Sequence, residues 1–118
     1  MDDAPAAASP SVADLHRALQ ALIGRGEGTS AAATTLRLAL LRQEHPAARV
    51  ATDVVRADGD VVVIHATIAL PDGAAGSGVA ARHVADPRDW AVAVEEAESR
   101  ALARALDTLG AVADLPAP

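Results

Sequence analysis

The pattern of apolar and polar residues predicts a helix close to the start of the chain. Ser11 and Asp14 form an S-x-x-D start signal that is close to a capping box. Apolar residues then recur at helical spacing, at Val12, Leu15, Leu19, Leu22 and Ile23. The pattern therefore predicts a first helix over residues 12–23 that stops at Gly24.

A second helix is predicted over residues 31–44, after the glycine-rich segment 24–30. Thr29 or Ser30 can cap its start, and Pro46 prevents its continuation. The glycine-rich segment is interpreted as a linker, because no lysine follows it and its glycine spacing differs from that of a phosphate-binding loop.

Three strands are predicted next, where the period of the pattern shortens to two. Residues 49–56 alternate, and residues 61–70 form a run rich in β-branched side chains. The A-D-G-D segment between these runs contains the Asp-Gly pair typical of a hairpin turn. A second turn, P-D-G, ends at Gly73 and leads to a third strand over 75–84. Gly78 lies inside this strand, which indicates a bulge or the close approach of another backbone.

A long helix closes the predicted fold. Asp86 can cap it, and Pro87 suits its first position, where a missing N–H costs nothing. The helix is predicted to reach Leu109, with Gly110 as the left-handed residue that follows its end. The sequence thus predicts an α+β fold, in which two N-terminal helices precede a three-stranded antiparallel meander and a long C-terminal helix packs on the sheet.

Length and composition fit one small domain. The chain has 118 residues and no cysteine, and a core of this size folds without a disulfide. We expect the domain to span residues 11–110, between a disordered tail (1–10) and a loose C-terminal tail (111–118). No apolar stretch is long enough to cross a bilayer and no signal peptide is recognisable, so a cytoplasmic protein without membrane attachment is expected.

The middle strand is apolar on both faces, which predicts self-association. One face would carry Val62, Ile64, Ala66 and Ile68, and the other Val61, Val63, His65 and Thr67. A single layer of helices covers one face, and an uncovered apolar face or edge favours a partner. We therefore expect a homo-oligomer.

The last helix places charged residues on both of its sides. Glu98 falls among small apolar residues on the packing side, where a carboxylate needs a partner. An arginine from another helix, or a threonine or histidine from a strand, would serve. Arg100 and Arg104 lie on the opposite side, which is either a solvated face or a track for phosphates. A catalytic role for Glu98 is the weaker alternative, because no second carboxylate or nucleophile has a matching spacing.

The motifs L-P-D-G (70–73) and G-S-G (76–78) precede the helix sequence A-E-S-R-A-L-A-R-A-L-D-T-L-G (97–110). Their order resembles the core of the Rad-fifty-two type single-strand annealing family, closest to its short phage and bacterial relatives. The helix positions that match the family pattern are Ala97, Glu98, Ala101, Leu102, Arg104, Ala105, Leu106, Leu109 and Gly110.

This resemblance implies single-stranded DNA binding and annealing in recombination or repair, without ATP, cofactor or enzymatic activity. It also implies rings or other oligomers that hold DNA in a basic groove. Arg104 matches a groove arginine of the family, and Arg37 lies at roughly the place of another. Arg100, Arg49 and Arg56 are further candidates for DNA contacts. Structural roles are expected for Glu98, Gly73, Gly78 and Gly110.

Two alternatives are left open by the sequence. The net charge of −6 and the absence of lysine favour a small oligomeric scaffold without a nucleic-acid ligand, because phosphate contacts dominate nucleic-acid affinity. The order helix, three strands, helix is also that of double-stranded RNA binding domains, which need lysines at the start of the last helix. That position reads D-P-R-D-W here. The four histidines lack the spacing of metal ligands, so no metal site is predicted.

Overall fold

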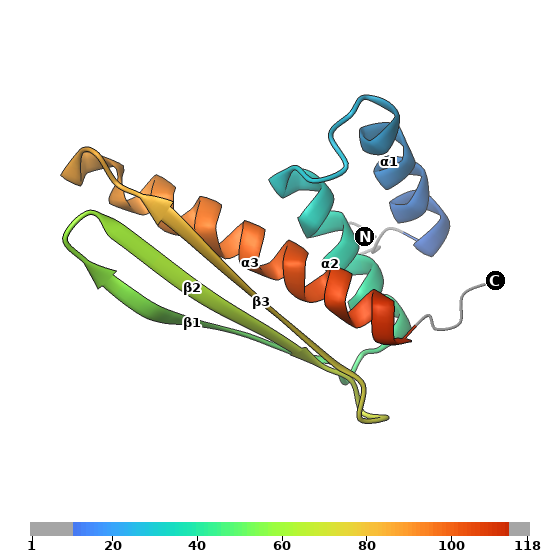
Figure 1. Cartoon of the computed structure of the whole chain (residues 1–118). Coiled ribbons are helices and arrows are strands. Elements are labelled where there is room, and N and C mark those ends of the chain that lie inside the picture. The colour runs from blue at the N-terminus through green and yellow to red at the C-terminus, as the bar shows by residue number, and fades with distance from the viewer. Residues whose placement is uncertain (1–10, 114–118) are drawn as a thin grey trace, which may run out of the picture.

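The computed structural model of the chain describes residues 11–113. Its helices and strands, in chain order, are α1 (Val12–Gly24), α2 (Ala31–Glu44), β1 (Arg49–Asp58), β2 (Val61–Ala69), β3 (Ala75–His83), the short 3-10 helix η2 (Pro87–Asp89) and α3 (Trp90–Ala113). Figure 1 shows α3 lying along the sheet, with α2 and then α1 stacked beyond it. The predicted α+β fold is confirmed. The predicted tail 1–10 and the end of the predicted C-terminal tail lie outside the described residues.

Side-chain caps set the starts of the helices. Asp14 N donates to Ser11 Oγ over 3.1 Å, and Ser11 N donates back to the Asp14 carboxylate over 3.4 Å, which completes the predicted capping box. Ser30 caps α2 by accepting from Ala33 N. Asp86 accepts from Arg88 N ahead of α3, with Pro87 at the first position of η2. These starts follow from local chemistry and agree with the sequence prediction.

The three strands form one antiparallel sheet in the order β1-β2-β3. The turn between β1 and β2 consists of Gly59 and Asp60, and Gly59 adopts a φ of +59° that suits glycine. Gly73 has a φ of +98° in the turn between β2 and β3. A bulge interrupts the pairing between Val54 and Arg56, so β1 carries the irregularity of this sheet.

The helix α3 approaches the sheet unusually closely because small residues meet at the contact. Gly76 and Gly78 of β3 lie under Ala101 and Ala105 of α3, and all four are buried. A Cβ atom on Gly78 would lie 2.7 Å from Ala105 N, so no side chain fits there. The glycines of this strand therefore serve the close approach of a backbone, which is one of the two roles predicted for Gly78.

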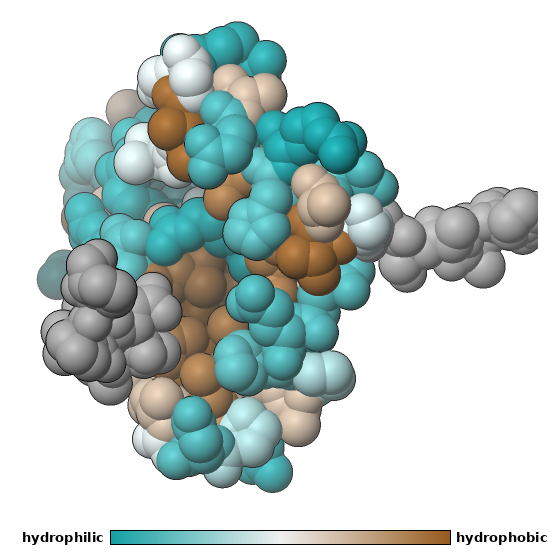
Figure 2. All heavy atoms as spheres, turned by 90° about the vertical axis from the view of Figure 1, so that its right-hand side faces the viewer, coloured by the Kyte–Doolittle hydropathy of each residue, from teal (hydrophilic) through white to brown (hydrophobic). Residues whose placement is uncertain are grey.

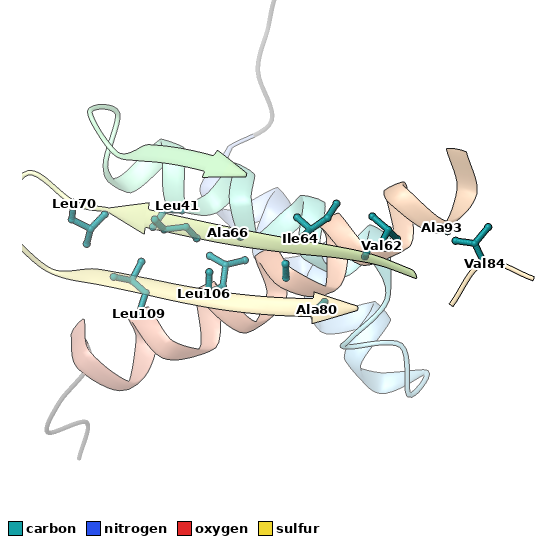
Figure 3. Packing of buried hydrophobic residues seen from close by; sticks show 14 residues of the cluster. Leu41, Val62, Ile64, Ala66, Leu70, Ala80, Val84, Ala93, Leu106 and Leu109 are labelled. Carbon is teal, nitrogen blue, oxygen red and sulfur yellow. The ribbon is translucent and has the colours of Figure 1, made fainter. Parts of the chain in front are cut away.

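Larger apolar side chains fill the rest of the core. Val62, Ile64 and Ile68 of β2 are almost fully buried and face α3. Figure 3 shows Leu106 and Leu109 of α3 extending the same cluster towards the end of the sheet where α2 lies. The buried side of β2 is therefore the side with Val62, and the valines at 61 and 63 are on the open side.

The predicted end of the last helix is wrong. α3 continues through Gly110 to Ala113, and the φ of Gly110 is not positive. A glycine ends a helix only where the chain must turn, and here the alanines that follow favour continued helix. Residues 111–113, which the sequence analysis placed in the C-terminal tail, are helical. Within residues 11–113, no helix has the length and apolar character needed to span a membrane.

Candidate functional site

The arginines predicted to bind DNA do not form one groove. Arg37 lies on α2, and its Nη2 donates to the carboxylate of Asp107 on α3 over 2.7 Å. Arg49 and Arg56 belong to β1, on the open side of the sheet away from α3. Arg37 therefore lies on a different surface from Arg49 and Arg56, which share the open side of the sheet away from the arginines of α3.

Side chains on one flank of α3, at positions 96, 100, 104 and 108, lie beside the outer edge of β3, and two of them form hydrogen bonds with its backbone. Arg104 Nη1 donates to the carbonyl oxygen of Val79, and Thr108 Oγ1 donates to the carbonyl oxygen of Ser77 over 3.1 Å. Both carbonyls belong to residues whose backbone groups point away from β2. Arg104, the strongest predicted DNA contact, thus has a structural partner that the sequence did not reveal.

The remaining members of that flank differ in their partners. Glu96 forms an ion pair with Arg82 of β3, with 2.8 Å between Arg82 Nε and the Glu96 carboxylate. Arg100 lies one turn before Arg104 and is exposed, and it makes no hydrogen bond or ion pair among residues 11–113. Three of the four side chains on this flank therefore contact β3, and Arg100 is the exception.

The β1–β2 turn and the start of α3 lie at the same end of the molecule, at the left of Figure 1. The acidic residues at this end are Asp58, Asp60, Asp86, Asp89 and Glu96. We call this the acidic end. Three arginines and one histidine at this end each have an acidic partner, with 2.6–2.9 Å between nitrogen and oxygen, and Asp89 is the carboxylate in excess. The pairs are Arg56–Asp58, Arg82–Glu96, Arg88–Asp86 and His83–Asp60.

Two of these pairs shift the pKa of one of their members. The hydrogen bond to Asp58 raises the pKa of the Arg56 guanidinium. Hydrogen bonds from the side chain and the backbone N–H of Arg88 lower the pKa of the Asp86 carboxyl. Both shifts stabilise charged groups that already satisfy each other. A phosphate that binds Arg56 or Arg88 would compete with the carboxylate that already pairs with that guanidinium.

Glu98 lies half-buried against the sheet. It accepts a hydrogen bond from Thr52 Oγ1 of β1 over 2.8 Å, so its partner is a strand threonine. Thr52 lies on the helix-facing side of β1, opposite Ala66 of β2. The hydrogen bond joins α3 to the edge strand that it otherwise leaves uncovered.

A small recess opens at the opposite end from the acidic end. Figure 2 looks onto this end and shows apolar atoms at the bottom of a hollow between polar ones. The recess has a volume of about 320 Å³, and its lining combines leucines with polar side chains at the rim: His16, Arg37, Leu40, Leu41, Glu44, His45, Leu70, Leu106, Leu109 and Gly110. Leu109 and Leu106 are themselves buried, so the recess is the outer margin of the core.

No group of three or more His, Asp or Glu side chains within residues 11–113 could hold a metal ion. His65 lies opposite Val79 and His83 lies opposite Val61, so the register separates these two strand histidines by several residues. Strand pairing therefore keeps these two histidines apart.

Comparison with known proteins identifies one family. The family model described as "Slr1353 N-terminal dsRNA-binding domain-like" matches residues 38–109, which include the end of α2, the whole sheet and most of α3. No curated protein and no solved structure matches the chain.

The family match overturns the resemblance to the Rad-fifty-two type annealing family. That resemblance rested on an alanine-rich helix with an R-A-L triplet after a glycine-bearing strand. The structure explains those features by packing, since Ala101 and Ala105 must be small to lie on Gly76 and Gly78. Close packing of a helix on a strand favours glycine and alanine at the contact, so these residues do not by themselves mark one family.

Proposed function

We propose that this chain, which belongs to the Slr1353 N-terminal dsRNA-binding domain-like family, is a protein-interaction module that self-associates and has no nucleic-acid ligand. The fold supplies a rigid sheet with one side under α3 and the other side open. The acidic end carries the proposal. Its basic residues are each paired with a carboxylate, and carboxylates remain in excess.

The charge of the acidic end carries more weight for this proposal than the likeness of the fold to RNA-binding domains. Binding of nucleic acid draws most of its affinity from neutralising phosphates with lysine or arginine. The start of α3, where a duplex-binding domain needs basic residues, carries Asp86, Arg88 and Asp89 in this chain. The net charge of −6 adds a long-range repulsion of phosphates.

A positive argument for self-association comes from the open side of the sheet. Val61 and Val63 are half-buried there, and Val79 is 49% exposed on the neighbouring strand. These side chains lie on one continuous surface because the strands pair in register. An apolar surface of this kind stays in contact with water, which is unfavourable, unless a partner covers it.

Binding of double-stranded RNA is the second candidate, and the description of the family favours it. A fluorescence anisotropy titration with a labelled 20-base-pair RNA duplex tests both candidates, with single-stranded DNA of the same length as a comparison. At 50 mM salt we expect the Kd to be weaker than about 10⁻⁴ M for both, which is the weak limit of ordinary non-specific binding.

Micromolar binding of the duplex that weakens steeply with salt would refute the interaction-module proposal in favour of RNA binding. In that case Arg88→Glu should weaken the binding. Arg17→Glu is the control, because Arg17 is paired with Asp14 on α1, far along the chain from the matched region. The mass of the protein in solution completes the test, since the proposal requires a species larger than the monomer.

A further inference from the structure

The two outer edges of the sheet differ in how they are protected. Along β3, side chains of α3 occupy the outward carbonyl oxygens of Ser77 and Val79. Along β1, no side chain among residues 11–113 bonds to the outward backbone groups. Figure 1 shows α3 running beside β3, whereas no helix lies along the outer edge of β1. The β1 edge is therefore the one that can accept another strand.

The register identifies which backbone groups of β1 are free. Leu70 N donates to Ala74 O and Val84 N donates to Asp60 O, so the even-numbered residues of β2 bond to β3. The odd-numbered residues of β2 then bond to β1, through Arg49, Ala51 and Asp53. Up to the bulge, the residues between these point their N–H and C=O groups outwards, namely Val50, Thr52 and Val54.

The charges on β1 are self-complementary about Ala51. Arg49 and Asp53 both lie on the open side of the sheet, two residues to either side of Ala51. Both side chains are exposed, and neither side chain forms a hydrogen bond or ion pair within the described part of the chain. The next charges along the strand, Arg56 and Asp58, already pair with each other.

We infer that the partner of this module is a second copy of the same chain, added antiparallel at the β1 edge with Ala51 opposite the other copy's Ala51. This inference rests on the self-association of the proposed function and places the contact at the β1 edge, so the open sides of the two copies become one continuous face rather than covering each other. Two-fold symmetry places Arg49 opposite Asp53 of the other copy twice, and both pairs fall on the open side. Val50 faces Thr52 of the other copy, and these are the residues whose backbone groups are free. The two sheets join into one sheet of six strands.

Other registers fit less well. A shift by two residues places Thr52 opposite itself, and Arg49 then faces Val55 while Asp53 faces Ala51. A shift by four places Asp53 opposite itself, which brings two carboxylates together. A shift by one residue is excluded, because it would pair residues whose backbone groups already bond to β2. The Ala51-centred register is the one that gives two attractive pairs.

A cysteine at position 51 tests the interface directly, because the chain has no cysteine of its own. In the proposed register the two Ala51 residues form a non-hydrogen-bonded pair with Cα atoms about 4.5 Å apart, within the range that a disulfide spans. We expect Ala51→Cys to form a covalent dimer in a glutathione buffer. Ala81→Cys, exposed on the open side of β3, is the matched control and should remain mostly monomeric on a denaturing gel.

Exchanging the charges at positions 49 and 53 tests the register without a crosslink. Arg49→Asp and Asp53→Arg should each raise the Kd of the dimer by at least about tenfold, since symmetry converts both attractive pairs into repulsive ones. The double variant should return to within about threefold of the original Kd. Arg56→Asp, on the same strand but paired internally, should leave the Kd within about threefold.

The outcomes separate this inference from the proposed function. A monomer at all concentrations would refute both. A dimer in which Ala81→Cys crosslinks faster than Ala51→Cys, or in which the double charge variant is no better than the single ones, would refute the β1 interface alone. Sedimentation of the full chain together with the crosslinking assay gives each of these results, and far-UV circular dichroism verifies that every variant is folded.

Discussion

At the residue scale, the contact between α3 and β3 depends on the smallest side chains of the chain. Gly76 and Gly78 let Ala101 and Ala105 lie directly on the strand, and the long rows of van der Waals contact that result are not available to larger residues. The same closeness brings Arg104 and Thr108 within reach of the carbonyl oxygens of β3. The small size of the contact residues therefore determines which backbone groups the polar side chains of α3 can reach.

Gly78→Ala should destabilise the fold. The new methyl group would lie 2.6 Å from Arg104 Cβ and 2.7 Å from Ala105 N, so α3 must move away from β3. Overpacking of this kind costs about 1–3 kcal/mol in the free energy of unfolding, which urea denaturation measures. Gly24→Ala is the control, because nothing lies within 4 Å of its added Cβ, and it should be neutral or stabilise by up to about 1 kcal/mol. Equal effects of the two substitutions would contradict the close approach.

Thr52→Val should destabilise the fold through Glu98. The substitution keeps the shape of the side chain but removes the hydroxyl that donates to the half-buried carboxylate. We expect a loss of about 1 kcal/mol, and Thr52→Ser should retain most of the stability because it keeps the donor. A double-mutant cycle with Glu98→Ala, which removes the acceptor, measures the coupling. A coupling energy of zero would show that the two side chains do not interact in solution.

At the element scale, capping side chains set where the helices begin, whereas other features depend on contacts between elements. The start signals at Ser11, Ser30 and Asp86 are complete within a few residues, so the sequence predicts them well. The bulge in β1 and the continuation of α3 past Gly110 depend on neighbouring elements, and the sequence does not reveal them. The unequal edges of the sheet belong to this scale too.

The capping box of α1 should lose its contribution in acid. Hydrogen bonding by Ser11, through its side chain and its backbone N–H, lowers the pKa of Asp14 below its ordinary value. A carboxyl whose pKa is lower in the folded state stabilises the fold above the unfolded pKa of about 4 and loses this effect as the pH falls through the folded pKa.

NMR titration of Asp14 should therefore give a depressed pKa, and Ser11→Ala should bring it back towards the ordinary value. The thermal midpoint of the original chain should also fall towards that of the Ser11→Ala variant as the pH drops below about 4. A gap between the two midpoints that stays constant down to pH 2 would argue against the box.

Removing the protection of the β3 edge should create a new site of association. The variant Arg104→Ala/Thr108→Val loses both side-chain donors to the carbonyl oxygens of Ser77 and Val79. With both edges open, pairing no longer closes after two copies, so we expect species larger than the dimer in light scattering. Arg100→Ala is the control, because Arg100 has no partner in residues 11–113 and should leave the mass unchanged.

At the scale of the whole molecule, stability is distributed unevenly. α3 packs on β2 and β3, α2 packs on α3, and α1 packs on α2 at the far side from the sheet. The buried cluster joins α3, β2, β3 and Leu41 of α2, whereas α1 contributes Leu15 and Leu22 outside that cluster. Each layer away from the sheet has less apolar area with which to hold its position.

Hydrogen exchange should follow this order. Amides of β2 and of the middle of α3 should exchange only through global unfolding, and those of α1 through local opening with a smaller free energy. A gradient of urea separates the two classes, because global unfolding responds more strongly to denaturant than local opening does. Equal protection of α1 and β2 would show that the helical hairpin and the sheet unfold as one unit.

The sequence by itself determined the helices and strands and their order, because caps, turns and periodicity act over a few neighbouring residues. It also determined the acidic balance that argues against a phosphate ligand. The tertiary structure decided the roles of the arginines and of Glu98, since Asp107, Val79 and Thr52 reach them from other elements. It also decided which edge of the sheet is free, because an edge is closed by whatever packs beside it, and packing is a property of the whole fold.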